Sequence, residues 1–287
     1  MTFTTLIAAA VLRDLVGRPD IAVIDCRFDL MNPAGGRRAY LEGHIPGARY
    51  ADLNMDLSAP ITATSGRHPL PTPADVARTL ARLGVGHTTQ VVAYDDSAGA
   101  FAARAWWMLR WVGHTAVAVL DGGIKAWVSE GGALESGQEK PLAEAAGRPY
   151  LSAQANSAAV LGTAEIEQRL PDPAFLLIDA RAGERYAGTV EPIDAVAGHI
   201  KGAVNHPFST DLAADGRFLP APVLRQGWER QLAGRSPTQV AAMCGSGVTA
   251  CHNLLSLEVA GFSGAKLYAG SWSEWIRDPH RPIARGA

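Results

Sequence analysis

The chain has 287 residues, enough for two domains of ordinary size that each bury an apolar core. Its hydrophobic content of 47% and its charged content of 19% are typical of a globular protein. The formal net charge of −2 gives no electrostatic reason to expect nucleic acid or an anionic membrane as a partner, so both are excluded.

The first apolar stretch covers residues 6–12 and is followed by two charged residues. No basic residue precedes it, so we expect it to form the first helix and not a signal peptide. The cysteines Cys26, Cys244 and Cys251 have neither the spacing of a metal-binding pair nor that of a disulfide framework. We therefore expect a protein of the reducing cytoplasm, with no metal and no organic cofactor.

Short apolar runs then alternate with helical patterns. The runs at 21–25, 90–94 and 175–179 are expected to be strands, and the segments 73–83 and 99–111 are expected to be helices. This alternation predicts an α/β fold in which each domain is a mainly parallel sheet flanked by helices.

The second half of the chain repeats landmarks of the first half in the same order. The sequence IDCR at the end of the first run returns as IDAR, and GHIPGA returns as GHIKGA. A repeat of this length predicts two tandem copies of one domain. We place the copies at residues 1–135 and 159–287, joined by a linker at 136–158 that is rich in small and charged residues.

Cys244 is the candidate nucleophile. It follows the apolar run 240–243, which is expected to be a strand, and is followed by glycine, serine and glycine, after which a helical pattern begins. The glycines let backbone N–H groups turn inward, and the N-terminus of the helix adds a positive dipole. Such a site suits a reactive thiolate.

The two copies differ at this loop. Their alignment places Asp95 opposite Cys244, and a carboxylate cannot take up sulfur. We therefore expect the C-terminal copy to be catalytic and the N-terminal copy to be non-catalytic.

The repeated strand ends, the two GHI-x-GA segments and the loop CGSGVTACH resemble the rhodanese-type sulfurtransferases over nearly the whole chain. The resemblance implies transfer of a sulfane sulfur from a small donor to Cys244, as a persulfide, and then to a thiol or cyanide. The CGSGVT loop is most similar to those of 3-mercaptopyruvate sulfurtransferases, and it lacks the basic side chains that would favour dianionic thiosulfate. A thioredoxin-like reductant is a further candidate partner.

The resemblance also implies roles for single residues. Ser246 is implied to relay protons with His68 and with an aspartate, for which Asp56 is preferred to Asp52. Arg185 is implied to hold the anionic group of the donor. The remaining loop residues are implied to surround the sulfur with backbone amides and one hydroxyl. They are Gly245, Gly247, Val248 and Thr249, and the hydroxyl of Thr249 can also cap the helix.

Alternatives remain open. The mercaptopyruvate group often has a second arginine where this chain has Ile193, so thiosulfate stays a candidate donor. A persulfide carrier that delivers sulfur to a protein partner is the third hypothesis. Cys251 is interpreted as a packing residue, because a resolving thiol would have to leave its helix. Residues that recur in both copies are expected to serve the fold, namely His44, His199, Asp25 and Asp179.

Overall fold

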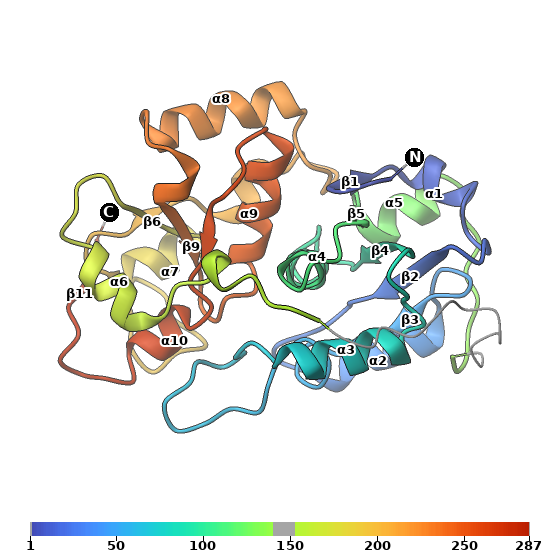
Figure 1. Ribbon diagram of the computed structural model, residues 1–287, viewed down its shortest axis with the longest axis horizontal. Helices are drawn as coiled ribbons and strands as arrows, with labels where there is room; N and C mark the ends of the chain where they lie inside the picture. The colour runs from blue at the N-terminus through green and yellow to red at the C-terminus, as the bar shows by residue number, and fades with distance from the viewer. Residues whose placement is uncertain (1, 140–152, 287) are drawn as a thin grey trace. The chain divides into compact units, whose positions relative to one another are not determined.

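The computed structural model describes residues 2–139 and 153–286, which form two compact units (Figure 1). The first unit is drawn from residues up to 59, from 71–156 and from 213–218. The second unit is drawn from 60–70, 157–212 and 219–287. Each unit thus includes a short segment that the predicted boundaries assign to the other half of the chain. Residues 140–152 of the predicted linker lie outside the described residues.

The first unit contains a five-stranded sheet in the order β1-β5-β4-β2-β3, with every neighbouring pair parallel. Its strands are Leu6–Ile7 (β1), Ile21–Asp25 (β2), Arg49–Tyr50 (β3), Gln90–Tyr94 (β4) and Val117–Leu120 (β5). Its helices are Ala9–Arg13 (α1), Ala34–Glu42 (α2), Pro73–Arg82 (α3), Ala102–Trp111 (α4) and Gly123–Ser129 (α5). The central strands are buried because helices cover both faces of a parallel sheet.

The prediction of one helix at residues 6–12 is wrong. Leu6 and Ile7 form β1 and pair with Val119 and Leu120 of β5, and α1 begins only at Ala9. The apolar run carries no local signal for this edge strand. Its backbone groups gain sheet hydrogen bonds that only the folded unit offers.

The second unit contains a four-stranded parallel sheet in the order β10-β9-β6-β8. Its strands are Leu176–Asp179 (β6), Val204–Asn205 (β8), Val240–Met243 (β9) and Lys266–Leu267 (β10), and His199–Ile200 (β7) pairs separately with Ile283–Ala284 (β11). Its helices are Thr163–Arg169 (α6), Gly183–Ala187 (α7), Ala221–Leu232 (α8), Ala250–Val259 (α9) and Ser271–Trp275 (α10). Short 3-10 turns lie at Ser157–Ala159, Phe208–Asp211 and Pro237–Gln239. The predicted class, two α/β copies with mainly parallel sheets, is confirmed.

Equivalent buried ion pairs close the first strand of each repeat. Asp25 pairs with Arg27 at 2.6 Å, and Asp179 pairs with Arg181 at the same distance. Each aspartate also accepts a hydrogen bond from the backbone N–H of its arginine at 3.0 Å. These aspartates therefore orient the chain where it leaves the strand, as predicted.

The two recurring histidines pack in the same way. The ring of His44 stacks on Tyr40 with centroids 3.9 Å apart, and the ring of His199 stacks on Tyr186 at 3.7 Å. In both cases Nδ1 lies within hydrogen-bond distance of the tyrosine carbonyl oxygen. Their structural role is confirmed by this repeated contact.

Among the residues described, none of the helices is both long enough and apolar enough to cross a membrane.

Candidate active site

Cys244 lies directly after β9, at the carboxyl end of the parallel sheet, where open α/β sheets usually bind their ligands. The six residues from Cys244 to Thr249 form the loop that joins β9 to α9. The Sγ atom of Cys244 accepts a hydrogen bond from the N–H of Gly247 at 3.1 Å, and the residue is only 2% exposed. The loop therefore turns a backbone donor toward the sulfur, as the glycine spacing predicted.

Gly247 must be glycine for two reasons. Its φ of +75° lies in the left-handed region, and a Cβ atom there would stand 2.5 Å from the carbonyl oxygen of Ala269. The close approach of residue 269 thus shapes the loop around the sulfur.

Three consecutive residues of α10 hold the loop from its other side. The hydroxyl of Ser271 accepts a hydrogen bond from the N–H of Cys244 at 3.1 Å. The N–H groups of Trp272 and Ser273 donate to the carbonyl oxygens of Cys244 and Gly245, at 3.0 and 2.9 Å. These bonds fix the backbone of the candidate nucleophile.

Ser271 was missed by the sequence analysis. Its φ is +54°, a left-handed conformation that is rare for a residue with a side chain. The equivalent residue of the first copy is Gly123, with φ +59°. A serine at a position where the other copy has glycine was the available signal that its hydroxyl serves the site.

His68 and Ser246 lie together, as the resemblance implied. Nδ1 of His68 is 2.7 Å from Oγ of Ser246, and the two residues are 4% and 5% exposed. His68 belongs to the segment 60–70 of the second unit. That segment is anchored at its neighbour Arg67, whose backbone N–H donates to Oγ of Ser273 at 3.0 Å.

Asp56, the preferred acid, and Asp52, the alternative, lie in the first unit. The carboxylate of Asp56 accepts a hydrogen bond from the N–H of Asp52 at 2.8 Å and pairs with Arg82 at 2.6 Å. The pairing of either aspartate with His68 stays a prediction.

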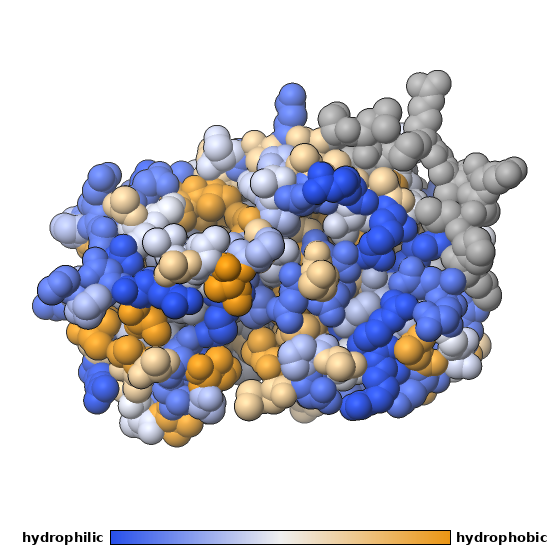
Figure 2. Space-filling model, turned by 90° about the horizontal axis from the view of Figure 1, so that it is seen from below, coloured by the Kyte–Doolittle hydropathy of each residue, from blue (hydrophilic) through white to orange (hydrophobic). Residues whose placement is uncertain are grey.

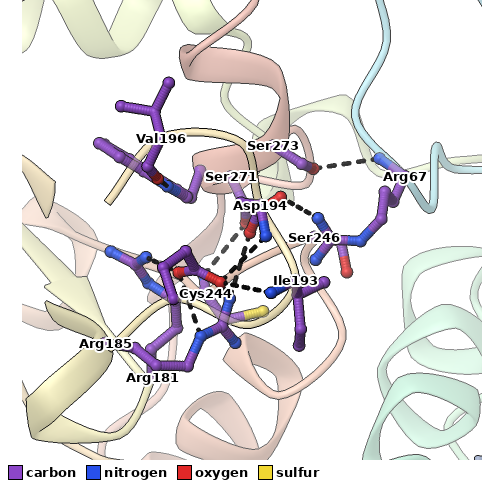
Figure 3. A network of polar contacts seen from close by, with 12 residues as sticks. Arg67, Arg181, Arg185, Ile193, Asp194, Val196, Cys244, Ser246, Ser271 and Ser273 are labelled. Atoms are coloured by element: carbon purple, nitrogen blue, oxygen red, sulfur yellow. Dashed lines mark hydrogen bonds and ion pairs between the residues drawn. The ribbon is translucent and has the colours of Figure 1, made fainter. Parts of the chain in front are cut away.

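Arg185 belongs to a cluster of charges near the loop (Figure 3). Its guanidinium pairs with Glu191 at 2.7 Å and with Asp194 at 3.1 Å. Asp194 also pairs with Arg67, so this one carboxylate bridges two arginines. Ile193 contributes only its backbone N–H, which donates to Glu191 at 3.0 Å.

The pKa values of the two acids of this cluster, Glu191 and Asp194, are shifted in opposite directions. Burial acts to raise the pKa of Glu191, but the hydrogen bonds from Arg185 and from two backbone amides lower it below its ordinary value. Burial raises the pKa of Asp194 above its ordinary range, although Arg67 and Arg185 act against this shift.

The loop of the first copy is anchored in the same way, but it has Asp95 at the position of Cys244. The N–H of Ile124 donates to the carbonyl of Asp95 at 2.9 Å, as that of Trp272 does to Cys244 at 3.0 Å. The carboxylate of Asp95 is buried and accepts hydrogen bonds at 2.8–2.9 Å from four backbone N–H groups of residues 97–102. The first copy thus keeps an amide nest but fills it with its own side chain, in agreement with a non-catalytic role.

The remaining loop candidates differ from one another. Val248 is buried, and the side chain of Thr249 does not form a cap bond to α9. Cys251 is fully buried in α9, and its thiol donates to the carbonyl oxygen of Gly247 at 3.3 Å. That contact fits the packing role expected for Cys251.

Two α/β copies, one with a cysteine in an amide-lined loop and the other with a carboxylate in the same place, define a thiol-dependent enzyme built by duplication. Residues 8–130 and 163–278 match the rhodanese-like domain family. The chain belongs to the rhodanese family.

Individual relatives extend over almost the whole chain. The chain is 49% identical to a probable 3-mercaptopyruvate sulfurtransferase of Pseudomonas aeruginosa, with 100% of both chains covered. It is 42% identical to the putative thiosulfate sulfurtransferase SseB of Mycobacterium tuberculosis, over 98% of this chain and 97% of that protein. Among solved structures, 3-mercaptopyruvate sulfurtransferase from Leishmania major matches with a TM-score of 0.83 and 30% identity, over 96% of this chain and 76% of that one.

Proposed function

We propose that the protein is a sulfurtransferase that moves a sulfane sulfur from 3-mercaptopyruvate, through a persulfide on Cys244, to a thiol or cyanide acceptor. The observation that carries this proposal is the contact between Sγ of Cys244 and the N–H of Gly247 at 3.1 Å. An amide aimed at sulfur stabilises the negative charge of a thiolate or a persulfide. The names of the relatives from Pseudomonas aeruginosa and Leishmania major agree with this donor.

The proposed reaction proceeds in two halves. The Cys244 thiolate attacks the sulfur of 3-mercaptopyruvate, an S–S bond forms, and the C–S bond breaks. The electron pair of the C–S bond stays on carbon as the enolate of pyruvate, which takes up one proton to give pyruvate. A thiolate or cyanide ion then attacks the outer sulfur of the persulfide and regenerates the Cys244 thiolate.

His68 and Ser246 are proposed to handle the proton of the first half. Their contact of 2.7 Å lets a proton pass between the imidazole and the hydroxyl. Donation toward the leaving carbon would then prevent a free enolate from forming in the site. Asp56 is proposed as the acid that orients His68, with Asp52 as the alternative.

Arg185 is proposed to bind the carboxylate of the donor. Its two terminal guanidinium nitrogens both lie 3.7 Å from the position that a Cβ atom on Gly245 would occupy. A guanidinium at this distance from the loop can hold a carboxylate by two parallel hydrogen bonds while the donor sulfur faces Cys244. Gly245, Gly247, Val248 and Thr249 are proposed to form the wall around the sulfur.

Thiosulfate is the second candidate donor. Ile193 has no positive charge, so its side chain cannot act as a second cation for the carboxylate of mercaptopyruvate. The relative from Mycobacterium tuberculosis is named a putative thiosulfate sulfurtransferase. A ratio of kcat/KM for the two donors decides between them.

A persulfide carrier that acts on a protein partner is the third candidate. The face of the molecule in Figure 2 shows apolar side chains in several small groups within a mostly hydrophilic surface. We propose the reducing cytoplasm as the compartment, because the nucleophile must stay a thiol, and a thioredoxin-like reductant as a candidate acceptor.

The intact mass of the protein before and after addition of each donor tests the proposal. A gain of one sulfur atom, about 32 Da, is expected in the wild type and not in Cys244→Ser, since a serine hydroxyl forms no persulfide. The Cys244→Ser substitution is buried but changes the side chain little in size, so the variant should unfold in the same transition as the wild type. A wild-type protein with a free thiol that gains no mass from either donor would contradict both enzyme hypotheses and leave the carrier.

A further inference from the structure

The first copy has a pocket beside the buried ion pair that closes its strand β2. The pocket has a volume of about 610 Å³ and lies between α2, α5 and the chain that follows α5. Its lining includes Arg27, Glu42, Ile124, Lys125, Val128 and Leu134, all of which belong to the first unit. This size and a mainly apolar lining are typical of a site for a small organic molecule.

The guanidinium of Arg27 is held in the same way as that of Arg181, its counterpart in the second copy. Nη2 of Arg27 donates to Asp25 at 2.6 Å and to the carbonyl oxygen of Gly43 at 2.7 Å. Nη2 of Arg181 makes the two equivalent hydrogen bonds at 2.6 and 2.8 Å. The two guanidiniums therefore have the same orientation in their copies, and their neighbours can be compared directly.

Two neighbours of Arg181 have no counterpart in the first copy. The indole ring of Trp272 covers the guanidinium of Arg181, with 4.9 Å between the ring centroid and Cζ. The equivalent residue of the first copy is Ile124, whose smaller side chain lines the pocket. Nη1 of Arg181 pairs with Glu191 at 3.5 Å, whereas within the described residues Nη1 of Arg27 has no hydrogen-bond or ion-pair partner. The first copy thus lacks one aromatic ring and one carboxylate at this arginine.

Arg27 is nearly buried where it lines the pocket. Its side chain is 8% exposed, and a donor without a partner on such a group is costly unless a ligand accepts from it. The ring of Tyr94 lies 6.0 Å from its Cζ, but Tyr94 is fully buried in β4 and leaves the pocket open. The unused donor therefore indicates that an anionic group binds here.

The charges at the rim of the pocket also favour an anion. Lys125 is exposed and has no ion-pair partner in the part of the chain that the structure describes. Glu42 lines the pocket as well, but its side chain is 71% exposed and faces Arg38 at 4.0 Å. Because Asp25 neutralises Arg27, the positive charge of Lys125 is the one left without compensation among these groups.

We propose that this pocket binds a planar aromatic carboxylate. Its ring covers the guanidinium of Arg27, and its carboxylate accepts from Nη1 of Arg27 and faces the ammonium group of Lys125. Both contacts form at once, because a guanidinium stacks through its face and donates hydrogen bonds in its plane. The ligand supplies to the first copy what Trp272 and Glu191 supply to the second. The site lies in the non-catalytic copy and is independent of the proposed sulfur transfer.

The test uses three probes that separate the ring from the charge. Methyl NMR of the full-length protein follows Ile124, Val128 and Leu134 during titration, so that it reports both the affinity and the place of binding. Indole-3-acetate is expected to bind with a Kd of about 1 mM, as its size allows. Indole-3-acetamide, which has no charge, should bind roughly tenfold more weakly. Cyclohexylacetate, which has no aromatic face, should bind roughly threefold more weakly. Equal binding of all three, or no shift of these methyl groups with indole-3-acetate, overturns the proposal.

A matched pair of variants locates the site. Val128 and Val223 are 50% and 48% exposed, and Val223 lies in α8 of the second unit. Val128→Glu brings a negative charge to the pocket and should weaken binding of indole-3-acetate at least tenfold, roughly the effect of one like-charge contact. Val223→Glu should bind as the wild type does. Wild-type affinity in Val128→Glu would place the probe elsewhere in the protein, and the proposal would then be wrong.

Ile124→Trp gives the first copy the residue that the second copy has at this position. The new indole ring should fill the pocket and prevent binding, and thermal unfolding shows whether the variant is folded. Lys125→Gln, at an exposed position, should weaken binding of indole-3-acetate roughly threefold. A folded Ile124→Trp protein that binds the probe like the wild type contradicts the proposal, and if this variant does not fold, Val128→Glu decides.

Discussion

Nδ1 of His68 lies 2.7 Å from Oγ of Ser246, although 178 positions of sequence separate the two residues. Both side chains are buried, so bulk water has little access to this contact. A histidine and a serine that share one proton path should act as a unit.

His68→Ala and Ser246→Ala should each lower kcat/KM for 3-mercaptopyruvate by roughly 10²-fold, the lower end of the range for general acid–base catalysis. The double variant should lose little more than either single variant, because the first substitution already breaks the path. Steady-state kinetics of the four proteins measures this. The exposed His87→Ala serves as control, and additive losses would show that the two residues act independently.

Gly247→Ala should destabilise the second unit more than Gly234→Ala does. Both glycines have positive φ, +75° and +82°, but only at Gly247 would the new Cβ meet a backbone atom, 2.5 Å away. We expect a loss of about 1 kcal/mol at Gly234 from φ strain alone and roughly 3 kcal/mol at Gly247, where steric strain is added. Urea unfolding of both variants gives the difference, and equal losses would contradict the steric argument.

Asp95→Asn should destabilise the first unit without preventing persulfide formation at Cys244. The carboxylate of Asp95 accepts hydrogen bonds from four backbone N–H groups. The NH₂ group of an asparagine would face two of these N–H groups, so that donor would meet donor. The expected loss is about 3 kcal/mol, against less than about 1 kcal/mol for Asp96→Asn, whose carboxylate accepts from the hydroxyl of Ser97. Thermal unfolding together with sulfur loading measured by mass tests this, and loss of loading in folded Asp95→Asn protein would give the first copy a direct role.

Glu191→Gln should change how stability depends on pH. The pKa of Glu191 is lowered in the folded protein, so its stabilising contribution is present above the ordinary glutamate pKa of about 4.3 and is lost as pH falls through the lower folded value. Asp194 acts in the opposite sense, since its raised pKa makes its ionisation unfavourable as pH rises. Near neutral pH we expect Glu191→Gln to cost about 3 kcal/mol, because Arg185 loses a buried partner.

Urea unfolding of wild type and Glu191→Gln between pH 3 and pH 7 checks the sign. The difference in unfolding free energy should shrink as pH falls below the ordinary glutamate pKa of about 4.3 and through the lower folded value, where the wild-type carboxyl takes up its proton. A difference that stays constant across this range would mean that the Glu191 charge contributes nothing.

Strands β2, β4 and β9 could be predicted from the sequence because each is a short apolar run that can be recognised from its own residues. The repeat identified the second copy as the one with the nucleophile, since aspartate and cysteine occupy equivalent loop positions. The segment at residues 6–12 was predicted wrongly because its strand exists only through pairing with β5.

The sequence by itself determined the duplicated α/β fold, the position of Cys244 between a strand and a helix, and the glycines that let the loop turn its amides toward sulfur. These depend on local periodicity and on the conformational freedom of glycine. Only the tertiary structure decided that Arg67 and Ser271 belong beside that loop, because each is brought there by contacts between segments far apart in the chain. The proline-rich sequence around Arg67 does not identify the loop that it contacts, and comparison of the two copies marks Ser271 as unusual without identifying its partner.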